Sequence, residues 1–318
     1  MTDAAPQMDV SICIVTYRAR DYLRDCLESL ESSTGVQRGA WNTASDESAA
    51  LHAAARLEII VVDNNSQDGI DEMLRNEFPA VRLIQNDHNA GYTRPMNQAL
   101  QAASQTRYLM QLNPDTLVLP HAIERLVAYM DEHPQVGICG PKVLNRDGSL
   151  QKSCRRGESR PWAVFTYFSG LAARYPNSPR FSQYHVSYLD ENQTAPVDGV
   201  SGSCMLIRQA VVDQIGYLDE LFFAYQEDAD YCFRARQAGW QVVYLPLAQI
   251  VHYGGMGGSK VEPYRSIFEW HRSYYNYYRK NLARDYFFLF NWFYYLAMLI
   301  KLGLALAANF VRGVLRQP

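Results

Sequence analysis

Short apolar runs and amphipathic segments alternate along the N-terminal half of the chain. Asp9–Tyr17 is a β-branched apolar run between polar residues, which is typical of a buried parallel strand. Asp21–Leu30 follows with apolar side chains at helical spacing. The pattern then predicts strands at Leu57–Val62, Val81–Gln85, Tyr108–Leu112 and Val136–Pro141, and helices at Ile70–Asn76, Thr93–Ser104 and His121–Glu132. This alternation predicts an α/β fold with a mostly parallel central sheet and helices on both faces.

Two segments depart from this alternation. Residues 32–56 are mostly small and polar without a clear period, and they predict an insertion or a surface loop. Residues 150–195 are first basic and turn-rich, then apolar, then polar, which makes them a candidate for ligand recognition beside a cleft. After them, Val197–Arg208 regains strand character, with small residues that would let a ligand approach the backbone closely.

The stretch Leu221–Gly239 combines aromatic, acidic and basic residues in a helical pattern that a glycine closes. Acids at the start and bases at the end of a helix suit the helix macrodipole, so this pattern has an ordinary structural explanation. The alternative is that Asp228 is a general base at the mouth of a cleft, with Glu227 and Asp230 beside it. The stretch alone leaves both interpretations open.

The composition indicates a globular protein with a sizeable core. The chain has 318 residues, of which 48% are hydrophobic and 20% charged, enough for one large or two ordinary domains. A net charge of -3 and a pI near 6.2 give no reason to expect nucleic acid as the main partner. The cysteines form no CxxC pair, and the N-terminus has neither a basic nor an apolar export region. We therefore expect buried thiols in a reducing compartment, and place the protein in the cytoplasm.

The C-terminal region changes this picture locally. Residues 264–318 contain eight Lys or Arg but only two acids, Glu269 and Asp285, together with dense aromatic clusters. Tyr286–Val311 is long enough to span a bilayer, which takes about 20 residues, but Asn291 and Lys301 interrupt it. Aromatic residues with basic flanks suit a helix in the headgroup region of an anionic membrane. A helical hairpin packed on the sheet or in a homo-oligomer interface is the alternative, and both are preferred to a true span.

Six motifs occur in an order that points to one family. There is no GxGxxG after the first strand and no GxxxxGK[ST] anywhere, which argues against a dinucleotide oxidoreductase and a P-loop NTPase. Instead the chain contains VSICIVTY, EIIVVDNNSQDG, NAGYTRPMNQAL, LNPDT, DGVSGSCMLIR followed by LDELFFAYQEDADYCFRARQAG, and VHYGG. Over about residues 9–260 the chain thereby resembles the family 2 glycosyltransferases of the GT-A fold, in particular bacterial rhamnosyltransferases of cell-surface polysaccharide synthesis. The resemblance implies a Rossmann-like GT-A domain over residues 1–262 and a helical extension over residues 263–318.

The resemblance also assigns roles to individual residues. Asp63 would contact the base or ribose of the nucleotide, since a carboxylate accepts from N–H and O–H groups. Asp115 matches the last acid of the family's DxD motif, here written NPD, and would hold Mg²⁺ or Mn²⁺ together with His252. Asp228 matches the catalytic base and is preferred to its neighbour Glu227. The other positions that match the donor pocket are Thr16, Tyr17, Arg18, Asn65, Asn89, Gly91, Arg94, Asn97, Asn113 and Gly202, and Arg18 stands where many relatives have Asn.

The implied function is an inverting, metal-dependent transfer of a sugar to a hydroxyl of a saccharide or a polyprenyl-linked saccharide. L-rhamnose from dTDP-rhamnose is the expected donor, at the inner face of the cell membrane, with residues 150–195 on the acceptor side. Three other donors stay open: UDP-galactofuranose, UDP-GlcNAc and UDP-glucose. So does a protein of another class, a non-catalytic scaffold that binds a nucleotide sugar.

Overall fold

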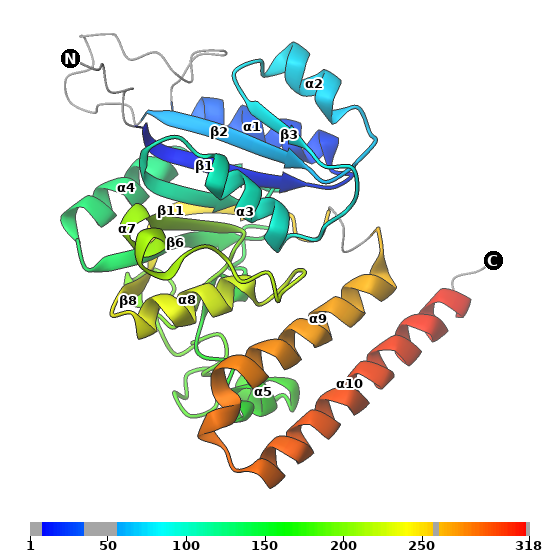
Figure 1. The fold of residues 1–318 in the computed structure, drawn as a ribbon. Helices are drawn as coiled ribbons and strands as arrows, with labels where there is room; N and C mark the ends of the chain where they lie inside the picture. Colours follow the sequence, from blue (N-terminus) through cyan, green and yellow to red (C-terminus); the bar gives the residue numbers. More distant parts are fainter. Residues whose placement is uncertain (1–7, 35–55, 257–260, 316–318) are drawn as a thin grey trace.

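The computed structural model describes residues 8–34, 56–256 and 261–315. Most of the insertion expected at residues 32–56 lies outside these residues. Its expected start is wrong, because the helix α1 (Arg20–Thr34) continues through residues 32–34. The α/β architecture predicted from the sequence is confirmed (Figure 1).

One large mixed sheet forms the centre of the molecule. Its strands run in the order β3-β2-β1-β4-β10-β6-β11-β5, and β8 pairs with β11. The first four are parallel, and β6 is parallel to β11, whereas β10 lies antiparallel between β4 and β6 and the edge strands β5 and β8 are antiparallel to β11. The strands are β1 (Met8–Thr16), β2 (Leu57–Asp63), β3 (Arg82–Gln85), β4 (Thr106–Leu112), β5 (Thr116–Val118), β6 (Val136–Leu144), β8 (Ala195–Pro196), β10 (Cys204–Arg208) and β11 (Gln241–His252). The prediction of a mostly parallel sheet is confirmed.

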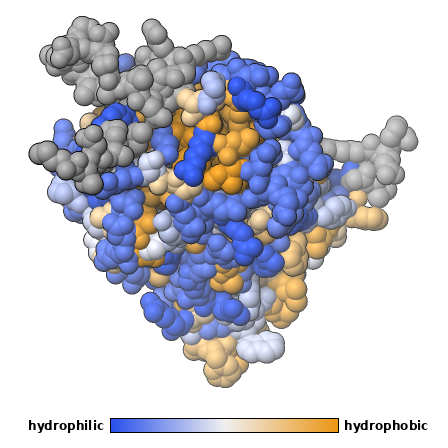
Figure 2. Space-filling view, turned by 45° about the horizontal axis from the view of Figure 1, so that its top comes forward, coloured by the Kyte–Doolittle hydropathy of each residue, from blue (hydrophilic) through white to orange (hydrophobic). Residues whose placement is uncertain are grey.

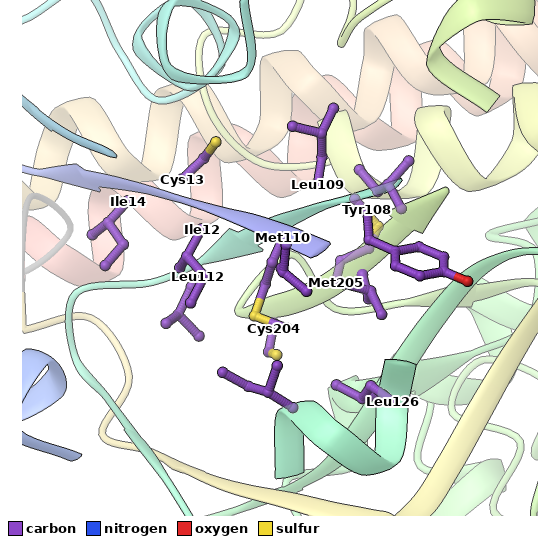
Figure 3. Packing of buried hydrophobic residues seen from close by; sticks show 14 of the residues in the cluster. Ile12, Cys13, Ile14, Tyr108, Leu109, Met110, Leu112, Leu126, Cys204 and Met205 are labelled. Atoms are coloured by element: carbon purple, nitrogen blue, oxygen red, sulfur yellow. The ribbon is translucent and has the colours of Figure 1, made fainter. Parts of the chain in front are cut away.

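The central strands are buried on both faces, as their continuous apolar sequences require. Ile12 of β1, Met110 of β4 and Met205 of β10 are wholly buried, and Figure 3 shows them stacked across neighbouring strands. Leu126 reaches the same cluster from the helix α4 (Ala122–Glu132). The six cysteines are free and buried, as expected for small core residues: Cys13, Cys26, Cys139, Cys154, Cys204 and Cys232.

Helices cover both faces of the sheet (Figure 1). On one face α4 contacts β6 and β11, and α1 contacts β5 and α4. On the other face α3 contacts β1 and β2, while α7 and α8 pack near β10 and β11. The helices of this face are α3 (Thr93–Ala102), α7 (Gln209–Ile215) and α8 (Glu227–Gln237). A further helix, α2 (Ile70–Glu77), lies near the sheet edge. The helix predicted within Leu221–Gly239 is therefore confirmed, and Gly239 follows it with a φ of 94°.

The strand directions bring the polar ends of several strands to one edge of the sheet. Because β1, β2 and β4 are parallel, their last residues Thr16, Asp63 and Leu112 lie at the same edge. Antiparallel β10 begins at this edge, since Cys204 pairs with Leu112. The parallel strand β11 ends there at His252. In open α/β sheets, ligands bind at the carboxyl ends of the strands, so this edge is where a site is expected.

Between β6 and β10 the chain forms short elements beneath this edge. The helix α5 (Pro161–Phe168) is the longest of them, and it arises from the apolar part of residues 150–195. The others are a 3-10 turn at Lys152–Cys154, β7 (Arg155–Arg156), α6 (Leu171–Arg174) and β9 (Gly199–Val200).

Two long helices complete the described part of the chain. α9 (Pro263–Tyr277) continues through a π turn at Tyr278–Leu282 and a 3-10 turn at Ala283–Asp285 into α10 (Phe288–Leu315). α9 and α10 lie side by side, with α5 near both (Figure 1). The predicted C-terminal helical extension is therefore present.

α10 presents an apolar surface outward. Asn291, which was expected to interrupt this segment, turns inward and donates to the carbonyl of Ala283 at 2.9 Å. Lys301 also turns inward, toward the ring of Trp270. Phe288–Arg312 is long and apolar enough to cross a membrane. Figure 2 shows the resulting hydrophobic surface as an orange band from the bottom to the lower right, where α10 lies. At least half exposed on α10 are Phe288, Leu289, Trp292, Phe293, Leu296, Leu299, Ile300, Leu304, Phe310 and Val311.

Candidate active site

A cleft of about 490 Å³ lies at the carboxyl edge of the sheet. Its walls include Tyr17 after β1, Asn113 after β4 and Gly202 before β10, and α8 contributes Asp228 from its first turn. The cleft thus joins motifs that are far apart in the sequence, as the strand directions require.

The start of α8 is built on an unusual backbone. Tyr225 and Gln226, the two residues before the helix, have φ values of 66° and 63°, in the left-handed region that non-glycine residues rarely adopt. Such conformations cluster at functional sites. Here they set the first turn of α8 so that Glu227 and Asp228 line the cleft, where the positive end of the helix dipole favours negative charge.

The carboxylate of Asp228 is held by a cation and a backbone amide. Arg156 Nη2 lies 2.6 Å from Oδ2, and the N–H of Gly202 donates to the same oxygen at 2.8 Å. A Cβ at position 202 would lie 2.4 Å from Gln111 Nε2 and 3.3 Å from Asp228 Cβ, so a side chain there would displace Gln111. Charge-assisted hydrogen bonds of this kind orient a carboxylate firmly. Asp228 is thereby fixed at the cleft wall.

Glu227 has a different environment from its neighbour. Its Oε2 is buried and has no hydrogen-bond partner among the described residues. Burial, and then the charge of Asp228, raise the pKa of Glu227 above its ordinary value. Of the two adjacent acids, Glu227 therefore favours its protonated form.

Asp115 and His252 also line the cleft, where they lie next to each other. His252 Nε2 lies 3.1 Å from Asp115 Oδ1, while Nδ1 lies 2.8 Å from Gln151 Oε1. Although burial opposes it, the hydrogen bond and charge of His252 hold the pKa of Asp115 below its ordinary value. Because an amide oxygen only accepts, Nδ1 of His252 donates to Gln151. With Nε2 unprotonated, His252 and Asp115 would present two electron-pair donors to a shared cation.

The donor set fits a divalent cation in part. Carboxylate oxygen and imidazole nitrogen are both ligands for Mn²⁺, and oxygen suits Mg²⁺. Among the described residues no group of three or more His, Cys, Asp or Glu side chains could hold a metal ion. A cation here would therefore take its remaining ligands from a bound diphosphate and water.

A network of amides forms the neighbouring wall. Asn89 and Gly91 line the cleft, and Asn64 Nδ2 donates to Asn89 Oδ1 at 2.8 Å and to the Gly91 carbonyl at 2.7 Å. Gly91 has a φ of 92°, and a Cβ there would lie 2.4 Å from the Phe223 carbonyl oxygen. Asn64 was not among the predicted site residues, although it stands in the same Asx-rich turn as Asp63 and Asn65.

Several predicted donor-pocket residues do not line this cleft. Asp63 is buried at the end of β2, where its Oδ1 accepts from the N–H of Ser66 at 3.1 Å, and burial raises its pKa. The amide of Asn97 donates to the carbonyl of Leu218 and accepts from its N–H, so Asn97 connects α3 to the loop before α8. Arg94 pairs with Glu220 at the surface. Outside the cleft lining also lie Thr16, Arg18 and Asn65, whereas Tyr17, Asn89, Gly91, Asn113, Asp115, Gly202, Glu227, Asp228 and His252 line it.

Asp230 points away from the cleft, contrary to the view that it stands beside Asp228. It is wholly buried and lies 2.7 Å from Lys280 Nζ and 3.0 Å from Arg234 Nε. Asn281 donates to the same carboxylate at 2.8 Å. Asp230 therefore connects α8 to the C-terminal helices.

Two further segments close the cleft. Residues 150–195 contribute Arg156, Tyr184 and His185, and α9 contributes Arg265 and Trp270. The basic run before α5 was the only sequence signal for Arg156, and nothing in the sequence singled out the others. The domain boundary expected after residue 262 runs through this wall, so the C-terminal helices belong to the cleft.

Comparison with known proteins identifies the family of the chain. The model of the Glycosyl transferase family 2 matches residues 11–216. Rhamnosyltransferase WbbL of Escherichia coli (strain K12) is 32% identical over 266 residues, covering 82% of this chain and 89% of that protein. The N-acetylglucosaminyl-diphospho-decaprenol L-rhamnosyltransferase of Mycobacterium tuberculosis (strain ATCC 25618 / H37Rv) is 28% identical over 263 residues, covering 80% and 77%.

Solved structures share the fold. The mannosyltransferase PcManGT from Pyrobaculum calidifontis, in complex with GDP-Man and Mn²⁺, matches with a TM-score of 0.56 at 16% identity, over 87% of this chain and 67% of that one. GalNAc-T7 with UDP, GalNAc and Mn²⁺ matches with a TM-score of 0.53 at 15% identity, over 85% and 48%. The family match over residues 11–216 and the relative at 32% identity show that the chain belongs to glycosyl transferase family 2 and is a GT-A-like glycosyltransferase.

Proposed function

We propose that this protein transfers L-rhamnose from dTDP-rhamnose to a hydroxyl of a polyprenyl-diphosphate-linked saccharide, with inversion at the anomeric carbon. The observation that carries the proposal is the single cleft that Asp228 lines together with the Asp115–His252 pair. The names of two relatives support the sugar, and that of the mycobacterial relative supports the lipid-linked acceptor.

Asp228 is the residue that we assign as the general base, because it lines the cleft and its carboxyl group is held in a fixed orientation. It would take the proton of the acceptor hydroxyl while that oxygen bonds to the anomeric carbon and the bond from that carbon to the phosphate oxygen breaks. The nucleoside diphosphate then leaves on the opposite face. Arg156 and the N–H of Gly202 would keep the carboxylate aimed at the acceptor throughout.

Asp115 and His252 are the residues that would hold Mg²⁺ or Mn²⁺ next to the donor. When bound, the cation would neutralise charge on the departing diphosphate. Gln151 would keep Nε2 of His252 directed at this position, through its contact with Nδ1. Asp63 would contact the nucleoside from beside the cleft, which requires some movement of the loop that holds it.

We place the protein at the inner face of the cell membrane, with the outward face of α10 in the headgroup region. The apolar side chains of that face, and the lipid-linked acceptor of the mycobacterial relative, support this location. Association of two copies through α10 stays a prediction.

The donor is tested by thermal unfolding of the full chain with Mn²⁺ and each of dTDP-rhamnose, UDP-galactofuranose, UDP-GlcNAc and UDP-glucose. A donor at about 100 times its Kd adds about 2.7 kcal/mol to stability, so the true donor raises Tm clearly. We expect the largest rise with dTDP-rhamnose, followed by transfer to N-acetylglucosaminyl-diphospho-decaprenol. If a UDP sugar raises Tm more than dTDP-rhamnose does and is also transferred, that sugar is the donor instead. If none of the four raises Tm, the non-catalytic scaffold is favoured.

A further inference from the structure

A second cavity, of about 680 Å³, lies between α5, α9 and α10. We call it the apolar groove. Its walls include Trp162, Phe165 and Phe168 of α5, Trp270 of α9, and Phe293 and Met298 of α10. Its size is within the range of about 300–1,000 Å³ that is typical of small-molecule sites. Phe165 and Phe293 are 56% and 71% exposed, so the groove is open, and no segment within the described ranges covers its aromatic walls.

The groove adjoins the catalytic cleft through α9. Trp270 lines both cavities. Tyr274 lines the groove and its hydroxyl contacts that of Tyr184, which lines the cleft. A molecule that passes along this part of α9 could therefore occupy both cavities at once.

One lysine ammonium group lies in the groove, close to this junction. Lys301 Nζ lies 4.0 Å from the centroid of the Trp270 ring and 4.5 Å from that of Phe168. His271 Nδ1 lies 2.7 Å from the carbonyl of Ile267 and donates to it, so Nε2 accepts from Lys301 at 3.1 Å. No carboxylate in the described part of the chain pairs with Lys301, whereas the comparable Lys280 pairs with two. An ammonium group in such surroundings is suited to an anion.

We propose that the apolar groove binds the first isoprene units of the lipid acceptor, with its diphosphate against Lys301 and its sugar in the cleft. This inference rests on the proposed function, because it assumes a polyprenyl-diphosphate-linked acceptor. The chemical order of such an acceptor, sugar then diphosphate then isoprenoid chain, matches the order of cleft, Lys301 and groove. The outward face of α10 borders the groove, so the rest of the chain can continue into the membrane.

The experiment measures binding of farnesyl diphosphate to the full chain in a mild detergent by isothermal titration calorimetry. Ala297 lines the groove and is exposed, so Ala297→Trp should fill the groove and weaken binding at least tenfold. Ala307 is also exposed on α10 but does not line the groove, so Ala307→Trp should leave Kd within twofold. Lys301→Met should weaken binding of farnesyl diphosphate at least tenfold but leave that of farnesol unchanged.

Competing ligands separate the contributions of the phosphate and the chain. Inorganic diphosphate and a short-chain phosphatidylglycerol should each compete poorly, since neither combines a diphosphate with an isoprenoid chain. No binding by the wild-type protein, equal Kd values for Ala297→Trp and Ala307→Trp, or full competition by phosphatidylglycerol would overturn the proposal. Circular dichroism of each variant excludes misfolding.

Donor binding keeps this test apart from the test of the function. All variants should bind the nucleotide sugar as the wild-type protein does. Suppose that neither the wild-type protein nor any variant binds a nucleotide sugar, but farnesyl diphosphate binds with the predicted differences between variants. The proposed function is then refuted and the lipid site is supported.

Discussion

Two adjacent carboxyl groups at the start of α8 differ because their surroundings differ. Arg156 and Gly202 bind the carboxyl group of Asp228 in the cleft, whereas Glu227 is buried and its Oε2 has no hydrogen-bond partner among the described residues. The sequence motifs favoured Asp228 over Glu227 as the base, but the different surroundings of the two residues are visible only in the structure, because Arg156 lies 72 positions away in the sequence.

This difference predicts opposite results for two isosteric substitutions. Asp228→Asn should lower kcat about 10²–10⁴-fold, because general base catalysis typically contributes that much. Glu227→Gln should keep kcat within a few fold, since an amide resembles the protonated form that Glu227 favours. Steady-state release of nucleoside diphosphate in the presence of acceptor measures both. The reverse order of the two effects would assign the base to Glu227.

Glu227 also predicts a dependence of stability on pH. Its pKa is raised in the folded protein, mainly by burial, so the folded state binds this proton more tightly than the unfolded state. The protonated Glu227 contributes its full stability below pH 4.5, the ordinary pKa of a glutamate. This contribution is lost as the pH rises through the raised pKa of the folded protein. Urea unfolding from pH 4.5 to 9 should show this loss in the wild-type protein and a smaller loss in Glu227→Gln. Parallel curves for the two proteins would contradict the environment that we describe.

At the scale of elements, α8 contributes side chains both to the cleft and to the contact with the C-terminal helices. Asp228 faces the cleft, while Asp230 is buried against Lys280 and Asn281 at the end of α9. The pattern of apolar residues predicted the helix but could not predict this division, since Lys280 lies 50 residues away. The same contacts connect the C-terminal helices, which form part of the cleft wall, to α8.

Removing the buried acid should therefore loosen this connection. Asp230→Ala removes the buried carboxylate that pairs with Lys280 and Arg234. Loss of one partner of a buried pair typically lowers the free energy of unfolding by about 3–5 kcal/mol. Asp219 is the matched control, because it also pairs with Lys280 at 2.7 Å but is 34% exposed. Asp219→Ala should cost about 1 kcal/mol or less. Equal urea midpoints for the two variants would refute the role of Asp230.

The outward face of α10 predicts binding to membranes. Trp292 and Leu299 are 73% and 64% exposed and do not line the apolar groove. Burial of one such side chain contributes about 1.5–3 kcal/mol, so Trp292→Glu with Leu299→Glu should lower partitioning into vesicles at least about 10²-fold. Flotation with vesicles containing anionic lipid measures this. Unchanged flotation would show that this face does not contact the bilayer.

At the scale of the whole molecule, the sequence predicted the features that depend on local patterns better than those that depend on long-range contacts. The strands β1 to β4, the helix α8 and the acids of the cleft follow from apolar periodicity and from motifs within short segments. The antiparallel direction of β10, the place of Arg156 and the cleft wall from α9 depend on contacts between distant segments, which periodicity does not encode. For the same reason Asn97 and Asp230 were expected near the ligand but instead connect elements.

The cleft, the apolar groove and the outward face of α10 form a continuous series along the C-terminal helices. In the proposed function, the nucleotide sugar would reach the cleft from the sheet edge, and the lipid acceptor would reach it along the groove from the membrane. The two substrates would then stay apart until they meet at Asp228.

Anomalous diffraction from crystals grown with Mn²⁺ and dTDP tests the central claim most directly, because it locates the cation and the donor nucleotide together. We predict one Mn²⁺ peak in contact with Asp115 and His252, with the diphosphate beside it and Asp228 across the cleft. A Mn²⁺ and nucleotide site elsewhere on the molecule, away from these three residues, would contradict the account.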